Sequence, residues 1–175
     1  MTDGIAPLPK NLELWQSTMG WQPEGAEQEL FQRLYGGILE GNQRMNLTRI
    51  VEPDEFWEKH IWDSVRGIFS EKVPALATLR SHDPFSAVDA EGQPAHVISM
   101  LDIGTGGGFP GLPIAIAQPN WSITLLDSTR KKIAFAGELA EALGLSNVEA
   151  IADRAEQIAR QPDARPQFDI VTLRA

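Results

Sequence analysis

The sequence predicts an α/β fold in which a parallel sheet follows a helical N-terminal extension. Three observations support this prediction. Before residue 70, apolar residues recur at steps of three and four, which is typical of amphipathic helices. From residue 97 onward, short apolar runs alternate with helical patterns, and a glycine-rich loop follows the first run. Such alternation indicates a Rossmann-like parallel sheet with helices on both faces.

Two amphipathic helices are expected before the sheet. The first spans 26–41 and the second follows Pro53, and each gathers its apolar residues on one face. These residues are Leu30, Phe31, Leu34, Tyr35, Ile38 and Leu39 in the first helix, and Trp57, Ile61, Val65 and Ile68 in the second.

The chain divides into a helical extension at 1–80, a loop at 81–96 and a cofactor-binding core at 97–175. The loop is expected because proline, glycine and aspartate recur in it. In the core, strands are expected at 97–103, 121–126, 147–151 and 168–173, with helices from about 112, over 129–143 and over 154–160.

Composition excludes several classes of function. The chain has no cysteine, which removes disulfides, thiolate zinc sites and cysteine nucleophiles. Its three histidines lack metal-ligand spacing, so no metal site is expected. A net charge of −9 argues against binding nucleic acid by charge alone. The sequence shows no membrane span and no signal peptide, so we expect a cytoplasmic protein without membrane contact.

The loop after the first core strand reads D-I-G-T-G-G-G-F-P-G, from Asp102 to Gly111. Ligands of open α/β sheets bind outside the carboxyl ends of the strands, where glycines let them approach the backbone. Asp127 closes the next strand, and a carboxylate there can accept both ribose hydroxyls of an adenosine. The spacing therefore indicates a cofactor that contains adenosine.

Three nucleotide ligands compete for this loop. A P-loop would need Gly-Lys-Ser/Thr, which is absent. A nicotinamide dinucleotide fits the spacing of the glycines, but Pro110 removes a backbone donor and Asp102 would repel the pyrophosphate. S-adenosylmethionine is cationic at its sulfonium and ammonium and has no phosphate, so the pattern favours it. An NAD(P)-dependent oxidoreductase remains the alternative function. The loop could also be a tight turn that binds no ligand.

The acceptor of a methyl group is narrowed by chemistry. Methylation at C5 of a pyrimidine normally uses a cysteine nucleophile, which this chain lacks. The fourth strand ends in T-L-R-A, without the Asn/Asp-Pro-Pro-aromatic loop of enzymes that methylate amino groups of bases. No general base is evident after that strand, so an acceptor with a free lone pair, such as guanine N7, suits the chain. This reasoning leaves the substrate open.

Several ordered motifs carry a resemblance to a known family. They are N-Q-R-M-N-L-T-R-I (42–50), F-W-E-K-H-I-W-D-S (56–64), L-D-I-G-T-G-G-G-F-P-G-L-P (101–113), T-L-L-D-S-T-R-K-K (124–132) and the pair D-R-A-E (153–156) and V-T-L-R-A (171–175). Together they closely resemble the RsmG (GidB) family of bacterial small-subunit ribosomal RNA guanine-N7 methyltransferases. The resemblance runs from about Glu29 to the last residue. It implies a class I methyltransferase fold and transfer of a methyl group from S-adenosylmethionine to N7 of one guanosine in 16S ribosomal RNA.

The resemblance also implies roles for individual residues. Eight would contact or border the cofactor, and none is assigned a catalytic role. In chain order they are Gly104, Phe109, Asp127, Ser128, Thr129, Ala155, Glu156 and Arg174. Four basic residues would meet RNA phosphates, or else form a solvated face: Arg130, Lys131, Lys132 and Arg154. His60 and Asp63 could line an RNA or cofactor pocket, but a hydrogen-bonded packing role for His60 is the favoured interpretation. Trp57 and Trp62 are expected to pack in the interior.

The expected partner is 16S ribosomal RNA or the small ribosomal subunit, bound by a monomer. Proteins of the resembled family continue beyond the fourth strand with a further helix and about three strands, whereas this chain stops at Ala175. The sheet is therefore expected to lack its C-terminal strands, which would leave the fourth strand at an edge. A fragment that binds cofactor and RNA without catalysis is a second alternative.

Overall fold

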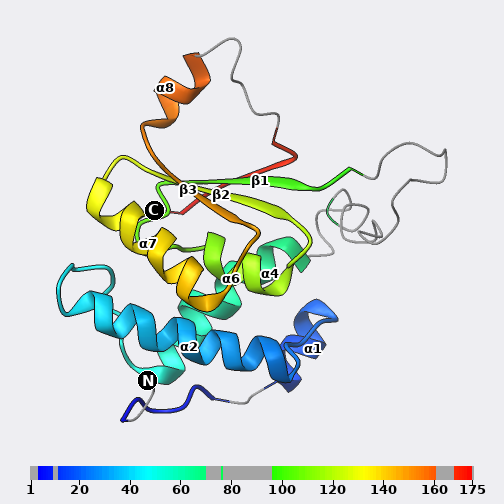
Figure 1. Ribbon diagram of the computed structural model, residues 1–175. Helices are drawn as coiled ribbons and strands as arrows, with labels where there is room; N and C mark the ends of the chain where they lie inside the picture. The colour runs from blue at the N-terminus through cyan, green and yellow to red at the C-terminus, as the bar shows by residue number, and fades with distance from the viewer. Residues whose placement is uncertain (1–3, 10–11, 70–75, 77–95, 161–167, 175) are drawn as a thin grey trace.

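The computed structural model describes residues 4–9, 12–69, 76, 96–160 and 168–174 (Figure 1). The helices before the sheet are α1 (Glu13–Met19), α2 (Gly25–Asn42), α3 (Pro53–Phe56), the π-helix η1 (Trp57–Trp62) and α4 (Asp63–Phe69). The core comprises β1 (Ser99–Ile103), α6 (Gly111–Ala117), β2 (Ser122–Asp127), α7 (Arg130–Leu143), β3 (Val148–Ala152), α8 (Ala155–Arg160) and β4 (Ile170–Leu173). Nearly all of the predicted loop 81–96 lies outside the described residues, so the boundaries drawn there stay a prediction.

The four strands form one parallel sheet in the order β3-β2-β1-β4. Because β1, β2 and β3 succeed one another in one direction, right-handed crossovers put α6 and α7 on the same face. The connection from β3 to β4 runs back across the sheet, so α8 lies on the other face, as Figure 1 shows. The predicted α/β alternation is confirmed.

The two faces of the sheet are covered unequally. On the face of α6 and α7, the strands bury Met100, Ile123 and Leu125 completely. On the other face, α8 has no buried residue, and a cavity of about 480 Å³ separates it from β1 and β2. At the edge of the sheet, Val171 and Leu173 of β4 are 57% and 75% exposed. The sequence predicts helices that cover both faces of the sheet. In the described part of the chain, only the face of α6 and α7 is fully covered.

The N-terminal helices form a second layer beneath α6 and α7. Helix α2 matches the predicted 26–41 helix and contacts both α6 and α7. Gly37 and Gly41 lie on its contact face, where an added Cβ would collide with Leu139 and Phe135 of α7. These two glycines cost some helical propensity, but they allow α2 and α7 to approach closely.

Aromatic side chains fill the interior of this layer. The ring of Trp57 lies 4.8 Å from that of Trp15 and 6.0 Å from that of Phe31, and all three are buried. Trp15 belongs to α1, a helix that the sequence analysis missed. The predicted packing role of Trp57 is confirmed.

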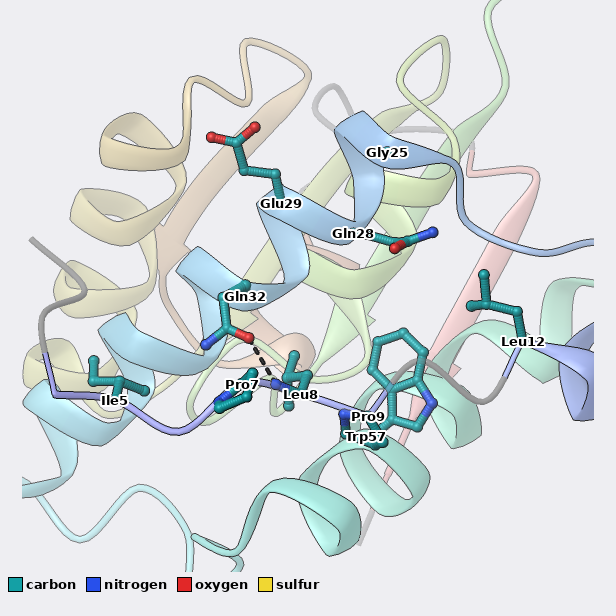
Figure 2. Close-up of a pocket in the computed structure, with 10 residues that line it drawn as sticks. All are labelled: Ile5, Pro7, Leu8, Pro9, Leu12, Gly25, Gln28, Glu29, Gln32 and Trp57. Atoms are coloured by element: carbon teal, nitrogen blue, oxygen red, sulfur yellow. Dashed lines mark hydrogen bonds between the residues drawn. The ribbon is translucent and has the colours of Figure 1, made fainter.

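The N-terminal segment is fastened along α2 by one side chain. Gln32 accepts a hydrogen bond from the backbone N–H of Leu8 (2.7 Å) and donates one to the carbonyl of Ala6 (3.2 Å). Figure 2 shows the first of these bonds beside a cavity of about 510 Å³, which Trp57 also lines.

Among the helices of the described ranges, none combines the length and the apolar character needed to cross a bilayer.

The helical pattern after Pro53 is continuous but changes its winding. Pro53 occupies the first turn of α3, where its missing N–H costs no hydrogen bond. The chain then forms η1, whose wider π winding ends as α4 begins at Asp63. Such π-helical turns are rare and are often found at functional sites. This one carries His60, which is buried.

Candidate functional site

The predicted cofactor residues lie at the end of the sheet where the carboxyl ends of the strands meet, which we call the carboxyl edge. Gly104 follows β1, Asp127 ends β2 and Arg174 follows β4. Ser128 and Thr129 continue from Asp127 to the N-cap of α7, while Ala155 and Glu156 begin α8 after β3. Because the four strands are parallel, their carboxyl ends lie at the same end of the sheet, with β3 and β4 as its two outer strands.

The glycine loop turns back over the end of β1 through left-handed backbone conformations. Gly104, Gly106 and Gly108 have φ values of 69°, 59° and 97°, which other residues rarely adopt. The N–H of Gly104 donates to the carbonyl of Leu126 at 2.7 Å and holds the loop against β2. An added Cβ on Gly104 would meet no atom within 4 Å. The loop is therefore rigidly held and open above its first glycine, where a ligand can approach the backbone.

Asp102 braces this loop from below. Its carboxylate accepts hydrogen bonds from Thr105 Oγ1 (2.6 Å), the N–H of Gly111 (2.9 Å) and Thr172 Oγ1 (3.2 Å). The side chain is completely buried, and burial raises the pKa of Asp102, although these hydrogen bonds offset part of the rise. From the sequence, Asp102 was expected to favour a cationic ligand over one with phosphates. The carboxylate instead faces the loop's own backbone, so its first role is to shape the loop.

Asp127 joins the loop to the second strand. One carboxylate oxygen accepts the N–H of Gly106 (2.9 Å), and the other accepts the N–H of Thr129 (2.7 Å). Each oxygen keeps a further lone pair for a ligand. The side chain is partly exposed at the carboxyl edge, so those lone pairs can accept hydroxyl groups.

Phe109 lies beneath the site. Its ring is only 6% exposed and stacks on the imidazole of His60, with 4.4 Å between the ring centres and 15° between the planes. The guanidinium carbon of Arg174 lies 5.6 Å from the centre of the same ring. A ligand on the carboxyl edge would therefore reach Phe109 through its backbone more readily than through its covered ring. The predicted cofactor contact of Phe109 stays a prediction.

Arg174 and His60 are linked across the two layers of the protein. Arg174 Nη2 donates to His60 Nδ1 at 3.0 Å, and Arg174 Nη1 donates to the carbonyl of Lys59 at 3.1 Å. Asp63 lies 3.7 Å from the guanidinium. On its other side, His60 Nε2 lies 2.7 Å from Thr48 Oγ1. Burial, together with the positive charge of Arg174, lowers the pKa of His60 to about 4. His60 is therefore buried and hydrogen-bonded, as the favoured interpretation of this residue expects.

The predicted RNA-facing basic residues lie near the same edge. Arg130, Lys131 and Lys132 begin α7, and Arg154 precedes α8. No ion pair between described residues includes any of the four. The carboxylate of Asp153 accepts the backbone N–H of Arg154 at 2.7 Å.

Sequence reasoning missed the threonines that complete this site. Thr48 was quoted only as part of a motif, and Thr105 and Thr172 were given no role. Thr172 pairs in register with Asp102, so both side chains project on the same face of the sheet. The threonine inside V-T-L-R-A was therefore the available signal, once β4 was placed beside β1.

Fold and site together define a Rossmann-like α/β protein with an open glycine loop at the carboxyl ends of its parallel strands. Residues 27–74 and 80–175 match the model of the GidB family, described as rRNA small subunit methyltransferase G. The chain therefore belongs to that family.

Curated relatives named "Ribosomal RNA small subunit methyltransferase G" are similar to almost the whole chain. The proteins of Trichormus variabilis and Microcystis aeruginosa are each 49% identical over 168 residues, which is 96% of this chain. The alignments cover 62% and 68% of those two relatives. The protein of Synechococcus elongatus is 46% identical over all 175 residues, and 63% of its length is covered. The chain thus spans roughly three fifths of the length of the relatives it matches.

Proposed function

We propose that this protein uses S-adenosylmethionine to methylate N7 of a guanosine in 16S ribosomal RNA. The proposal rests mainly on the arrangement of residues at the carboxyl edge. There, an open glycine loop lies beside Asp127 and Arg174, in a chain of the GidB family. The names of the relatives support ribosomal RNA as the substrate class. The choice of guanine N7 rests on the resemblance and on the chemistry below.

The donor set of the site suits S-adenosylmethionine. Asp127 has lone pairs for the ribose hydroxyls, and the open backbone at Gly104 leaves space for the amino-acid part. Ser128 and Thr129 would complete the ribose side, Ala155 and Glu156 would border the adenine, and Arg174 would meet the reacting end. The loop from Asp102 to Gly111 contains no basic side chain for phosphates. When bound, S-adenosylmethionine supplies the methyl group.

The residues around this edge position an acceptor and do not activate it. The carboxylate of Asp102 is buried and occupied by three donors. His60 has a depressed pKa, and both ring nitrogens have partners. Neither group is free to take a proton from a hydroxyl or an amine. Guanine N7 has its own lone pair, so orientation of the base is the contribution required of the protein.

The RNA would approach over α7 and α8. Arg130, Lys131, Lys132 and Arg154 offer cations for phosphates beside the cofactor edge, although the whole chain carries a net charge of −9. Such local attraction favours a structured target, either 16S RNA or the assembled small subunit, over binding by general charge. We infer a monomeric, cytoplasmic protein without membrane contact.

Calorimetric titration tests the cofactor. Titration of the full chain with S-adenosylhomocysteine and, separately, with NAD is expected to show micromolar binding of the first only. Micromolar binding of NAD alone would establish the oxidoreductase alternative. Cofactor and RNA binding without methyl transfer to small subunits would support the non-catalytic alternative.

A further inference from the structure

We propose that His60 is a positioning residue of the cofactor site, which fixes the guanidinium of Arg174 to receive the carboxylate of the methionine moiety. The inference rests on the proposed function, since it concerns the same cofactor. It adds a role for the N-terminal helical layer, which supplies His60 from η1 to a site built otherwise by the sheet.

The hydrogen bonds determine how His60 is protonated. An arginine side chain can only donate, so Nδ1 of His60 must carry a lone pair where it meets Arg174 Nη2 at 3.0 Å. The ring proton therefore lies on Nε2, which donates to Thr48 Oγ1 at 2.7 Å. That hydroxyl oxygen also accepts the N–H of Ile50 at 3.0 Å. His60 is thus held in one tautomer by its neighbours.

The surroundings of His60 restrict it further. The imidazole is 7% exposed and lies between Phe109, stacked at 4.4 Å, and Phe56, edge-on at 5.0 Å. The charged groups that face it are Arg174 after β4 and Asp63 on the following helix. Protonation would put two positive charges together, so the neutral ring is the form that can hold Arg174.

Arg174 is well placed to use this support. It has five N–H donors, and its hydrogen bonds to Lys59 and His60, together with the ion pair to Asp63 at 3.7 Å, leave others available. Its side chain is 29% exposed, so part of it remains accessible to a ligand. A planar guanidinium binds a carboxylate through paired hydrogen bonds, provided that its orientation is fixed. His60 and the carbonyl of Lys59 fix that orientation.

Two substitutions of His60 separate its two hydrogen bonds. His60→Asn retains an acceptor near the position of Nδ1, whereas His60→Gln retains a donor near the position of Nε2 and loses the acceptor for Arg174. At pH 7.5, we expect His60→Gln to weaken S-adenosylhomocysteine binding about tenfold, the scale of a lost hydrogen bond to a charged group. His60→Asn should remain within about threefold of the wild type on the same reasoning.

Adenosine is the matched ligand, because it lacks the methionine moiety. Its affinity should be nearly equal in all variants, which a general structural defect would not produce. In an Arg174→Gln background, His60→Gln should cause no further loss, since it acts through Arg174. His96→Gln is the control variant. This exposed histidine pairs with Asp169 at the other end of the sheet, where the strands β1 and β4 begin. Circular dichroism and thermal melting check that each variant folds.

The proposal is overturned if folded His60→Gln binds S-adenosylhomocysteine like the wild type. It is equally overturned if His60→Gln lowers the affinity for adenosine by the same factor. The same holds if His60→Gln still lowers the affinity for S-adenosylhomocysteine in the Arg174→Gln background. These outcomes differ from failure of the proposed function, in which the wild type itself would not bind S-adenosylhomocysteine.

Discussion

The carboxylate of Asp127 accepts a hydrogen bond of 2.9 Å from the backbone N–H of Gly106, although the two residues are 21 positions apart. This contact fixes the glycine loop relative to the end of β2. It makes the loop and the acidic residue one unit, with which a single adenosine can interact. Its consequences for binding can be measured.

Asp127→Ala should lower the affinity for S-adenosylhomocysteine by about 1–3 kcal/mol, the cost of leaving hydrogen-bonding groups without partners. Both the ribose contacts and the anchor of Gly106 would be lost. Isothermal titration calorimetry measures the change. Asp54→Ala, which removes an exposed carboxylate of α3, is the control and should leave affinity unchanged. Unaltered binding in Asp127→Ala would show that β2 does not contribute to the cofactor site.

Asp102→Ala should reduce the stability of the fold. It would leave Thr105 and the N–H of Gly111 without an acceptor in a buried position, and Thr172 would keep only the carbonyl of Leu101 at 3.5 Å. We expect the free energy of unfolding to fall by about 3 kcal/mol or more, since each unsatisfied buried group costs about 1–3 kcal/mol. Asp102→Asn keeps most of these partners and should lose about half as much on the same scale. Equal, small losses in urea denaturation would contradict the bracing role.

Gly41→Ala should destabilise the protein because the added methyl group would collide with Phe135 of α7. Overpacking of this kind costs about 1–3 kcal/mol. Gly67 is the matched control: it lies in α4, and an added Cβ there would meet nothing within 4 Å. Gly67→Ala should stabilise the helix by up to about 1 kcal/mol. Thermal unfolding of the two variants measures the difference, and a stabilising Gly41→Ala would refute the close contact of α2 with α7.

His60 should make stability depend on pH. Its pKa falls from 6.5 in the unfolded chain to about 4 in the folded protein. Above pH 6.5 the ring is neutral in both states, so stability is fully present. Between pH 6.5 and 4 only the unfolded state binds the proton, and stability falls by up to about 1.4 kcal/mol per pH unit.

His60→Phe removes this titration while keeping an aromatic ring between Phe56 and Phe109. Urea denaturation of the wild type and the variant from pH 7 to 5 should therefore show a steeper decline in the wild type. Parallel pH profiles would mean that His60 titrates normally in the folded protein.

The sequence was sufficient for the parts of the fold that depend on local patterns. The β1 strand, the glycine loop and α7 each have a periodic or glycine signal within a short window, and all were predicted within two residues of their bounds. Gly144, which has a φ of 77°, ends α7 as glycine commonly ends helices. Helix α1 lacks such a signal: it is short, its N-cap Leu12 makes no side-chain hydrogen bond, and only Trp15 and Met19 are buried.

The site was predictable as a set of residues but not as a set of contacts. His60 and Arg174 are 114 positions apart, and their pairing requires η1 to meet the end of β4. The π-helical winding that carries His60 has no known pattern in a single sequence. Asp102 illustrates the same limit, because the groups that donate hydrogen bonds to its carboxylate could be identified only after β4 and α6 were placed around it.

Mapping of methylated bases in 16S ribosomal RNA tests the proposed activity most directly. RNA from cells with the gene should contain one guanosine methylated at N7, and this modification should be absent after deletion of the gene. Reintroduction of the intact gene should restore it, whereas a gene carrying Asp127→Ala should not restore it fully. An unchanged level of N7-methylguanosine in the deletion strain would contradict the proposed function.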